Sequence, residues 1–326
     1  MNKAITYESK LAPYINGLIE EKQACGFDFT SEAKSFKNFD SFVLSKGFDN
    51  GKLDYNLVSQ WCKKRPTECE TTLVARINLV IMLASYLRSL GIEAYIAPRG
   101  TSKNKPVPYV LSRTEIDEFF ACAKEFCIDC YTDKKNRLGF LLYYIMFHLY
   151  YYCGMRLNEA VVLEVTDVDL AEGIIRIKHS KGDKDRLVFP AKNVLSLLLE
   201  YNKQADFYYP SRQWFFPGTK EGCHCHKCTV IHAFNRVWEK LHGIQIKHPT
   251  IHSLRHTFVV HRIDSWVEEG KDLNVMIPYL QKYLGHSSVE ETMYYYHSLD
   301  SQSKATRDCF EKNGIVSMEA LENDII

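Results

Sequence analysis

A short basic stretch divides this chain of 326 residues into two parts with different hydrophobic patterns. Residues 99–111 carry Arg99, Lys103 and Lys105 but no acidic residue, and two prolines and a glycine discourage regular structure there. A stretch of this kind is typical of a linker between domains. We therefore expect a first domain at 1–98, a linker at 99–111, a second domain at 112–300 and a C-terminal tail at 301–326.

The part before the linker has the apolar spacing of helices. Leu73, Ile77 and Ala84 recur at intervals that place them on one face of a helix, and Gly91 stands where a helix C-cap is expected. Residues 1–98 are therefore expected to form a helical domain.

The part after the linker mixes helical and strand patterns. Ser112 and Glu115 have the spacing of a helix-capping box. Residues 174–178 and 187–189 have the strand period, and the polar, glycine-containing segment 180–186 between them predicts a hairpin loop. The remaining segments are helical. The expected fold is mainly α with a small antiparallel β-hairpin or sheet, divided into an N-terminal helical domain and a mixed α/β domain.

Charge and cysteine content limit the class of protein further. The formal net charge of +1 excludes a uniformly basic protein, although a local basic face is enough to bind nucleic acid. The 11 cysteines follow no secretory signal, so we expect reduced thiols and a cytoplasmic protein. The longest apolar run, residues 141–153, is short for a membrane span and predicts a buried core helix.

Two pairs of polar residues could together hold an anion. Arg156 follows a glycine turn, and Glu159 is close enough in sequence to hold its guanidinium. His252 and Arg255 lie on one face of the first turn of an expected helix, where the helix dipole favours a phosphate. Each pair also has a purely structural interpretation, as an ordinary ion pair or as solvated charges at a helix start.

Three further positions carry groups that can transfer protons or attack phosphorus. Lys181 lies in the expected hairpin loop, where a lysine can protonate a leaving oxygen. His286 follows Gly285 and can donate to a phosphate oxygen. Three adjacent tyrosines, residues 294–296, offer a phenol that can act as a nucleophile beside cations. Taken singly, such a histidine is more often structural and such tyrosines more often belong to aromatic packing, while a solvated turn is the alternative for the lysine.

The order of these residues resembles the catalytic domain of the tyrosine site-specific recombinases, the phage integrase family. The pattern is Arg-x-x-Glu, a hairpin lysine, His-x-x-Arg, Leu-Gly-His, and a tyrosine nine residues later. The resemblance covers residues 112–300 and extends loosely to the N-terminal helices, which are similar to that family's SAM-like core-binding domain. It implies that Arg156 and Arg255 hold the scissile phosphate, Lys181 is the general acid, His252 assists proton transfer, His286 fills the family's His-or-Trp position, Tyr295 is the nucleophile and Glu159 supports the site.

The resemblance implies a recombinase or integrase of a mobile element that cleaves and rejoins DNA through a 3′-phosphotyrosyl intermediate. Because this link conserves bond energy, neither ATP nor any other cofactor is needed for catalysis. The implied partners are double-stranded DNA, further copies of the chain in a tetramer on DNA, and accessory proteins; no membrane is implied. The tail is expected to dock on a neighbouring subunit. Expected DNA contacts are Arg99, Lys103, Lys105, Lys184 and Arg186.

Two other functions fit the same residues. A type IB topoisomerase-like enzyme would use similar chemistry without strand exchange. A non-catalytic DNA-binding regulator would have a recombinase-like fold and bind DNA without cleaving it.

A dense group of thiols and imidazoles lies outside this pattern. Zinc is bound by such side chains, although the spacing here is tighter than in the usual paired motifs. A DNA-facing loop with incidental thiols and a redox switch are the alternatives. The candidate zinc ligands are Cys223, Cys225, His226 and Cys228.

Overall fold

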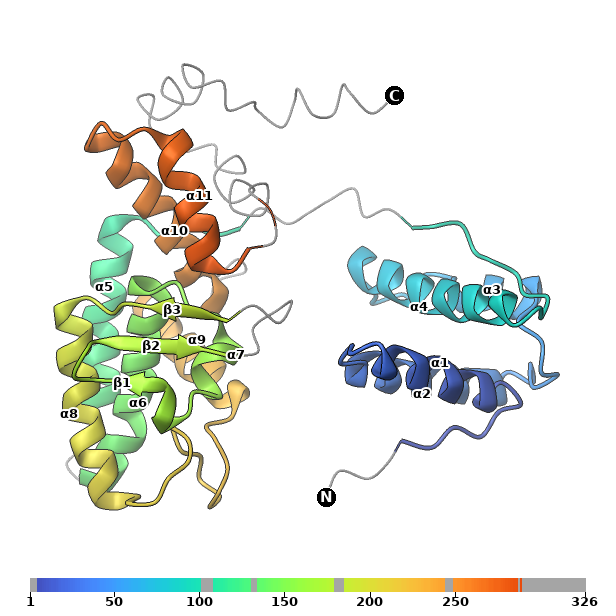
Figure 1. Cartoon of the computed structure of the whole chain (residues 1–326), viewed down its shortest axis with the longest axis horizontal. Helices are drawn as coiled ribbons and strands as arrows, with labels where there is room; N and C mark the ends of the chain where they lie inside the picture. Colours follow the sequence, from blue (N-terminus) through green and yellow to red (C-terminus); the bar gives the residue numbers. More distant parts are fainter. Residues whose placement is uncertain are drawn as a thin grey trace. The chain divides into compact units, whose positions relative to one another are not determined.

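The computed structural model describes residues 5–100, 108–129, 134–178, 185–243, 249–286 and 288. The chain divides into two compact units, residues 1–106 and residues 107–326 (Figure 1).

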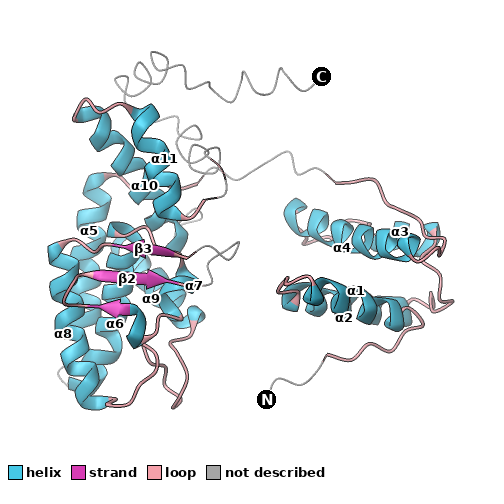
Figure 2. Ribbon diagram, viewed as in Figure 1, coloured by secondary structure: helices cyan, strands magenta, loops and turns pink. Residues whose placement is uncertain are grey.

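The N-terminal unit is a group of helices around one apolar core (Figure 2). Trp61 and Phe39 are fully buried there and meet edge to face, with ring centroids 5.0 Å apart. Asp40 is also buried, and its carboxylate accepts the backbone N–H groups of Glu8 and Ser9 at 3.0 and 2.9 Å, which fastens the segment before the first helix. The helices are α1 (Ala12–Ala24), α2 (Thr30–Ser45), α3 (Tyr55–Trp61) and α4 (Glu70–Ser89).

Helix α4 is the longest of these helices and, by length and composition alone, could cross a membrane. Its residues Ile77, Val80 and Leu83 are nevertheless buried in the core of the N-terminal unit, against α1 and α2. This packing is that of a core helix in a folded domain.

The C-terminal unit packs helices around a small antiparallel sheet with strand order β1-β2-β3. Ile175 of β2 pairs with Val168 of β1 on one side and Val188 of β3 on the other. The strands are β1 (Val168–Asp169), β2 (Ile174–Ile177) and β3 (Arg186–Val188); the helical segments are α5 (Arg113–Lys124), η1 (Glu125–Asp129), α6 (Lys134–Tyr152), α7 (Leu157–Val161), η2 (Val165–Asp167), α8 (Lys192–Tyr208), α9 (Lys227–His242), α10 (Ile251–Glu268) and α11 (Leu273–Leu284).

The predicted fold class is confirmed: the chain is mostly helical with a small antiparallel sheet. The capping box at the start of α5 is also present, with Ser112 Oγ accepting the N–H of Glu115 and the Glu115 carboxylate accepting the N–H of Ser112. The short strand β1 was not predicted, because two residues are too few to display a period.

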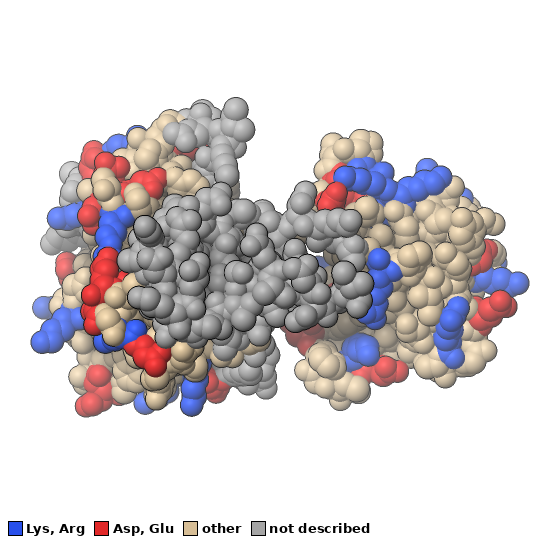
Figure 3. Space-filling model, turned by 90° about the horizontal axis from the view of Figure 1, so that it is seen from above, with Lys and Arg blue, Asp and Glu red and all other residues tan. Residues whose placement is uncertain are grey.

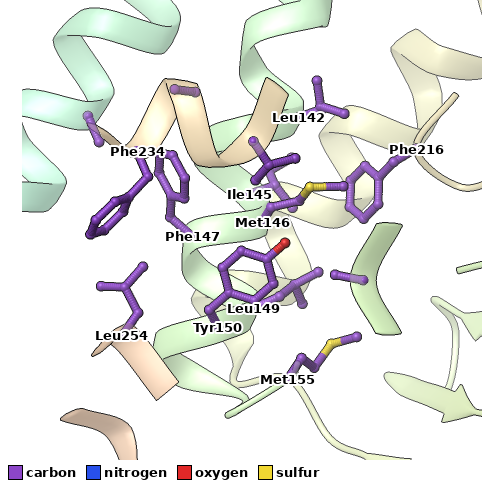
Figure 4. Close-up of a cluster of buried hydrophobic side chains, with 14 of the residues drawn as sticks. Leu142, Ile145, Met146, Phe147, Leu149, Tyr150, Met155, Phe216, Phe234 and Leu254 are labelled. Atoms are coloured by element: carbon purple, nitrogen blue, oxygen red, sulfur yellow. The ribbon is translucent and has the colours of Figure 1, made fainter. Parts of the chain in front are cut away.

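Helix α6 forms the centre of the C-terminal unit, with α8, α9 and α10 packed around it. Ile145, Met146 and Phe147 are fully buried although they point in different directions from the helix axis (Figure 4). They meet Phe216 and Phe234 from segments much later in the chain. The predicted buried helix over residues 141–153 is therefore confirmed, and it anchors the turn that follows at Gly154.

Candidate active site

Arg156 is positioned by a tight glycine turn at the end of α6. Gly154 has φ +60°, and a Cβ added there would lie 2.7 Å from the ring of Phe258. Only glycine therefore fits this turn without strain. Arg156 then occupies the N-cap position of the five-residue helix α7, with its side chain only 18% exposed.

Glu159, in the first turn of α7, is a buried carboxylate that receives four hydrogen bonds. Its Oε1 accepts from the guanidinium of Arg156 at 3.0 Å and from Arg186 at 2.7 Å. Its Oε2 accepts from the backbone N–H of Arg156 at 2.7 Å and from Arg186 at 2.6 Å. Both oxygens are thus fully engaged, and the carboxylate cannot rotate without breaking several bonds.

These contacts keep Glu159 ionised. Burial raises the pKa of its carboxyl group, but the hydrogen bonds and charge of Arg186, the Arg156 amide and the charge of Arg255 outweigh burial and hold the pKa at about 2. The site therefore contains a fixed negative charge among several positive ones.

Arg255, in the first turn of α10, is 3% exposed and reaches the same region. Its guanidinium donates to the carbonyl of Gly154 and, at 2.9 Å, to the carbonyl of Leu284. It also lies 3.0 Å from Nε2 of His286. Because a guanidinium can only donate, Nε2 accepts, and the proton of the neutral imidazole is on Nδ1.

The C-cap of α11 joins the two arginines. Gly285 adopts the left-handed conformation, with φ +65° and ψ 41°, as a helix C-cap commonly requires. Its carbonyl accepts from Arg156 at 3.0 Å, while the preceding carbonyl, of Leu284, accepts from Arg255. The turn thus holds two guanidiniums beside each other and places His286, which is 6% exposed, next to them.

Two histidines at the start of α10 complete the described part of the site. His252 is exposed, and its ring stacks on that of His256 with centroids 5.8 Å apart. Desolvation and the charges of Arg255 and Arg156 lower the pKa of His252. Burial, followed by the charges of His252, Arg255 and His286, lowers the pKa of His256 to about 3. Both rings are therefore neutral near pH 7; the exposed His252 can accept a proton, whereas the low pKa of His256 makes it a poor base.

The structure brings together Arg156, Glu159, Arg255, His252 and His286 from the predicted set. Arg99 is exposed at the end of the N-terminal unit. The other predicted site residues, Lys103, Lys105, Lys181, Lys184 and Tyr295, and the tail from residue 301, lie outside the described residues.

Arg186 lies in a different environment from the one expected of a DNA contact. Its side chain is 6% exposed, and both ends of its fork bind Glu159. Arg186 and Val188 are two residues apart in β3 and share the covered face of the strand, whereas Leu187 between them is exposed. The strand alternation in the sequence could have predicted this burial, but the presence of Glu159 opposite could not be read from it.

The candidate zinc ligands do not form a metal-binding group. Within the residues that the structure describes, no three His, Cys, Asp or Glu side chains are placed to hold a metal ion. His226 instead caps α9 by accepting the N–H of Cys228 at 3.3 Å. Cys225 is buried, with its sulfur 3.6 Å from the hydroxyl of Thr229. The geometry does not support the predicted zinc site.

Two guanidiniums, a neutral histidine pair and a helix N-terminus can act on a phosphodiester. Guanidinium forks bind phosphate oxygens through paired hydrogen bonds and stabilise the added negative charge of the transition state. Beyond the bonds described above, the N–H groups of Arg156 have no partner in the described part of the chain. This arrangement could bind an anion, with the neutral His252 beside it as a proton acceptor.

The chain is similar in sequence to integrases and tyrosine recombinases. A family model described as the phage integrase family matches residues 113–302, which is more than half of the chain. A protein of Sinorhizobium fredii, y4eF, classed as an integrase/recombinase, is 30% identical over 241 residues, 72% of this chain and 84% of its own. A tyrosine recombinase of Thermosipho africanus is 30% identical over 72% of this chain and 74% of its own.

Solved structures share the fold. The XerH site-specific recombinase, solved in a post-cleavage complex with its palindromic difH substrate, has a TM-score of 0.63 at 20% identity, covering 88% of this chain and 79% of that one. The Tn1549 transposon integrase, in complex with a circular intermediate DNA, has a TM-score of 0.63 at 13% identity, covering 92% of this chain and 99% of that one.

Proposed function

This chain belongs to the phage integrase family of tyrosine site-specific recombinases, and from this premise we propose that it cleaves and rejoins DNA of a mobile element with Tyr295 as nucleophile. Members of the family break and reseal phosphodiester bonds without a cofactor. The observation that carries the proposal for this chain is the convergence of Arg156 and Arg255 on the Leu284–Gly285 turn, with His286 beside them.

The proposed reaction uses each residue for one task. The two arginines hold the non-bridging oxygens of the scissile phosphate and stabilise charge as the phosphorus becomes five-coordinate. The hydroxyl of Tyr295 attacks the phosphorus and loses its proton to the neutral His252. Lys181 gives a proton to the departing 5′ oxygen, so that the phosphate remains joined to tyrosine as a 3′ diester. The reverse steps on a partner strand complete rejoining.

The N-terminal unit is proposed to bind the DNA backbone as a core-binding domain. Lys63, Lys64 and Arg65 are exposed just after α3, and Lys and Arg side chains are spread over the face of this unit that Figure 3 shows. The linker residues Arg99, Lys103 and Lys105 extend the basic character along the chain. Contacts of this type are with phosphates and carry little sequence information.

We propose that four copies assemble on DNA, that the tail from residue 301 docks on a neighbouring subunit, and that accessory proteins direct the reaction. The structures of XerH and of the Tn1549 integrase, both solved in complex with DNA, support DNA as the partner. An enzyme acting on chromosomal or element DNA is expected in the cytoplasm. Zinc has no part in the proposed chemistry, and cleavage in the presence of a chelator tests this.

Strand transfer between duplexes of different length separates this function from its alternatives. The substrates are duplexes carrying the element ends or, where these are unknown, duplexes selected by the protein from a random-sequence pool. A recombinase produces strands of recombinant length. A type IB topoisomerase-like enzyme relaxes supercoils without producing them, and a non-catalytic regulator binds without cutting. Either of these last two results overturns the proposed function.

A further inference from the structure

We propose that Arg186 is a positioning residue for DNA cleavage, holding Glu159 so that Glu159 fixes the guanidinium of Arg156 toward the phosphate. The inference rests on the proposed function, because it takes Arg156 to bind the scissile phosphate. It replaces the expected direct DNA contact of Arg186 with an indirect role inside the site.

The first support is the geometry of the Arg186–Glu159 pair. The two terminal nitrogens of Arg186 bind different oxygens of the carboxylate, at 2.7 and 2.6 Å. A paired contact of this kind fixes both the position and the plane of the carboxylate, which a single hydrogen bond does not. With 6% of the Arg186 side chain and 5% of the Glu159 side chain exposed, water does not compete for these bonds.

The second support is the set of hydrogen bonds that the Glu159 carboxylate accepts in addition to those from Arg186. Once Arg186 is bound, each oxygen has one further hydrogen bond, and both come from Arg156: its guanidinium at 3.0 Å and its backbone N–H at 2.7 Å. The plane set by Arg186 therefore determines where Arg156 is held. The other end of that guanidinium is held by the carbonyl of Gly285.

The third support is charge. A buried carboxylate paired with Arg156 alone would cancel the positive charge that Arg156 offers to a phosphate. With Arg186 added, the group of two arginines and one glutamate carries a net positive charge. Interactions between charges are strong at sites removed from water, so this excess favours an anion beside Arg156.

The fourth support is the place of Arg186 in the chain. It is the first residue of β3, and it follows the proposed general acid Lys181 by five positions in the sequence. The bonds from Arg186 to Glu159 fasten the start of β3 to α7, the element that begins at Arg156.

The test is a double-mutant cycle on Arg186→Met and Glu159→Gln, measured on the full chain. The substrate is the nicked duplex, selected from a random-sequence pool, on which the wild type forms its covalent adduct. We expect Arg186→Met to lower the single-turnover cleavage rate at saturating protein by about tenfold or more, with the Kd for the duplex changed by less than about threefold. The double variant should cleave no more slowly than the slower single variant.

Arg186→Lys measures rescue. A lysine can bind one oxygen of Glu159 but not both in a fixed plane, so it should recover part of the rate that Arg186→Met removes. If Arg186→Met does not fold, the same cycle is run with Arg186→Lys, whose rate should then lie below that of the wild type.

Arg212→Met is the matched control. Arg212 is a buried arginine, 4% exposed in its side chain, that pairs with Asp206 and bonds Asn202 at 2.6 Å in the same unit. We expect its removal to lower the Tm while leaving the cleavage rate, measured well below the Tm, unchanged.

Two results overturn the inference. One is a folded Arg186 variant that cleaves at the wild-type rate. The other is a cycle in which the two reductions in rate multiply, or in which binding falls in the same ratio as cleavage. Absence of any adduct with the wild type would instead contradict the proposed function, so the two failures are distinguishable.

Discussion

The proposed active site depends on two arginines, Arg156 and Arg255, that come from distant segments and are held by the same turn. Removing either side chain takes away transition-state charge stabilisation while leaving most backbone contacts to DNA. We expect Arg156→Ala and Arg255→Ala to lower the cleavage rate about 100-fold or more and to change the Kd for DNA only a few-fold. Single-turnover cleavage and equilibrium binding on one duplex measure both quantities.

Arg236→Ala is the control for these two variants. Arg236 is exposed on α9, where its guanidinium lies over the ring of Phe126 at 5.1 Å, and it has no role in the proposed site. Its removal should change neither quantity. Equal reductions of cleavage and binding in Arg156→Ala or Arg255→Ala would mean that these arginines only anchor the DNA backbone.

The buried histidine in α6 predicts how stability depends on pH. His148 is 6% exposed among the rings of Phe120, Tyr144 and Tyr152, and burial lowers its pKa to about 4. In the unfolded chain its pKa is about 6.5, so between these values the unfolded state binds more protons. Stability should therefore fall as the pH drops below about 6.5, by about 1–2 kcal/mol at pH 5 from this residue.

Urea unfolding at pH 7.5 and pH 5 measures this dependence. His148→Phe removes the titrating group and places a further aromatic ring among those that line the site. The loss of stability between pH 7.5 and pH 5 should therefore be smaller in this variant by about 1–2 kcal/mol. An unchanged pH dependence in the folded variant would show that His148 is not responsible.

The glycine turn between α6 and α7 determines where α7 begins and therefore where the side chain of Arg156 lies. Gly154→Ala should lower the free energy of unfolding by about 2–4 kcal/mol, because it adds a contact at 2.7 Å with the Phe258 ring to the strain of a positive φ. Gly270, which follows α10 with φ +67° and open space around it, is the control. Gly270→Ala should lower the free energy of unfolding by only about 1 kcal/mol. Urea unfolding measures both variants. Equal losses of unfolding free energy would show that the contact with the Phe258 ring does not contribute.

Local signals in the sequence predicted several of these elements correctly. The capping box at Ser112, the buried helix over residues 141–153 and the β2–β3 strand pair depend on neighbouring residues, and each is present in the structure. The Arg186–Glu159 contact joins residues 27 positions apart. Because no local period encodes such a pairing, Arg186 was predicted to be a DNA contact and not a partner of Glu159.

The structure does not support the zinc prediction for a similar reason, because spacing along the chain does not show how side chains are arranged in space. Spacing along the chain indicated metal binding, but a metal site needs side chains that converge in space. Cys225 points into the core and His226 caps a helix, so the local backbone geometry separates these groups. Residues such as Lys181 and Tyr295 remain predictions from the sequence pattern.

The chain has a formal net charge of only +1, so the proposed binding of DNA depends on local basic surfaces and not on overall charge. Affinity for duplex DNA should therefore fall steeply with salt. Replacing Lys63, Lys64 and Arg65 together by alanine should reduce the slope of log K against log salt by about one for each phosphate that these side chains neutralise. Replacing Lys34, an exposed lysine on α2, is a control for the removal of one charge elsewhere on the unit. An unchanged slope in the triple variant would exclude these residues from the DNA-binding surface.

Mapping the covalent bond between the protein and DNA tests whether Tyr295 is the nucleophile. The wild type is incubated with nicked duplexes that trap the cleaved strand, the adduct is isolated on a denaturing gel, and the modified peptide is identified by mass spectrometry. We predict a 3′-phosphotyrosyl link at Tyr295 that disappears in Tyr295→Phe while DNA binding is retained. An adduct at Tyr294 or Tyr296 would contradict the assignment of Tyr295 as nucleophile. Binding without any adduct on every duplex would contradict the proposed function.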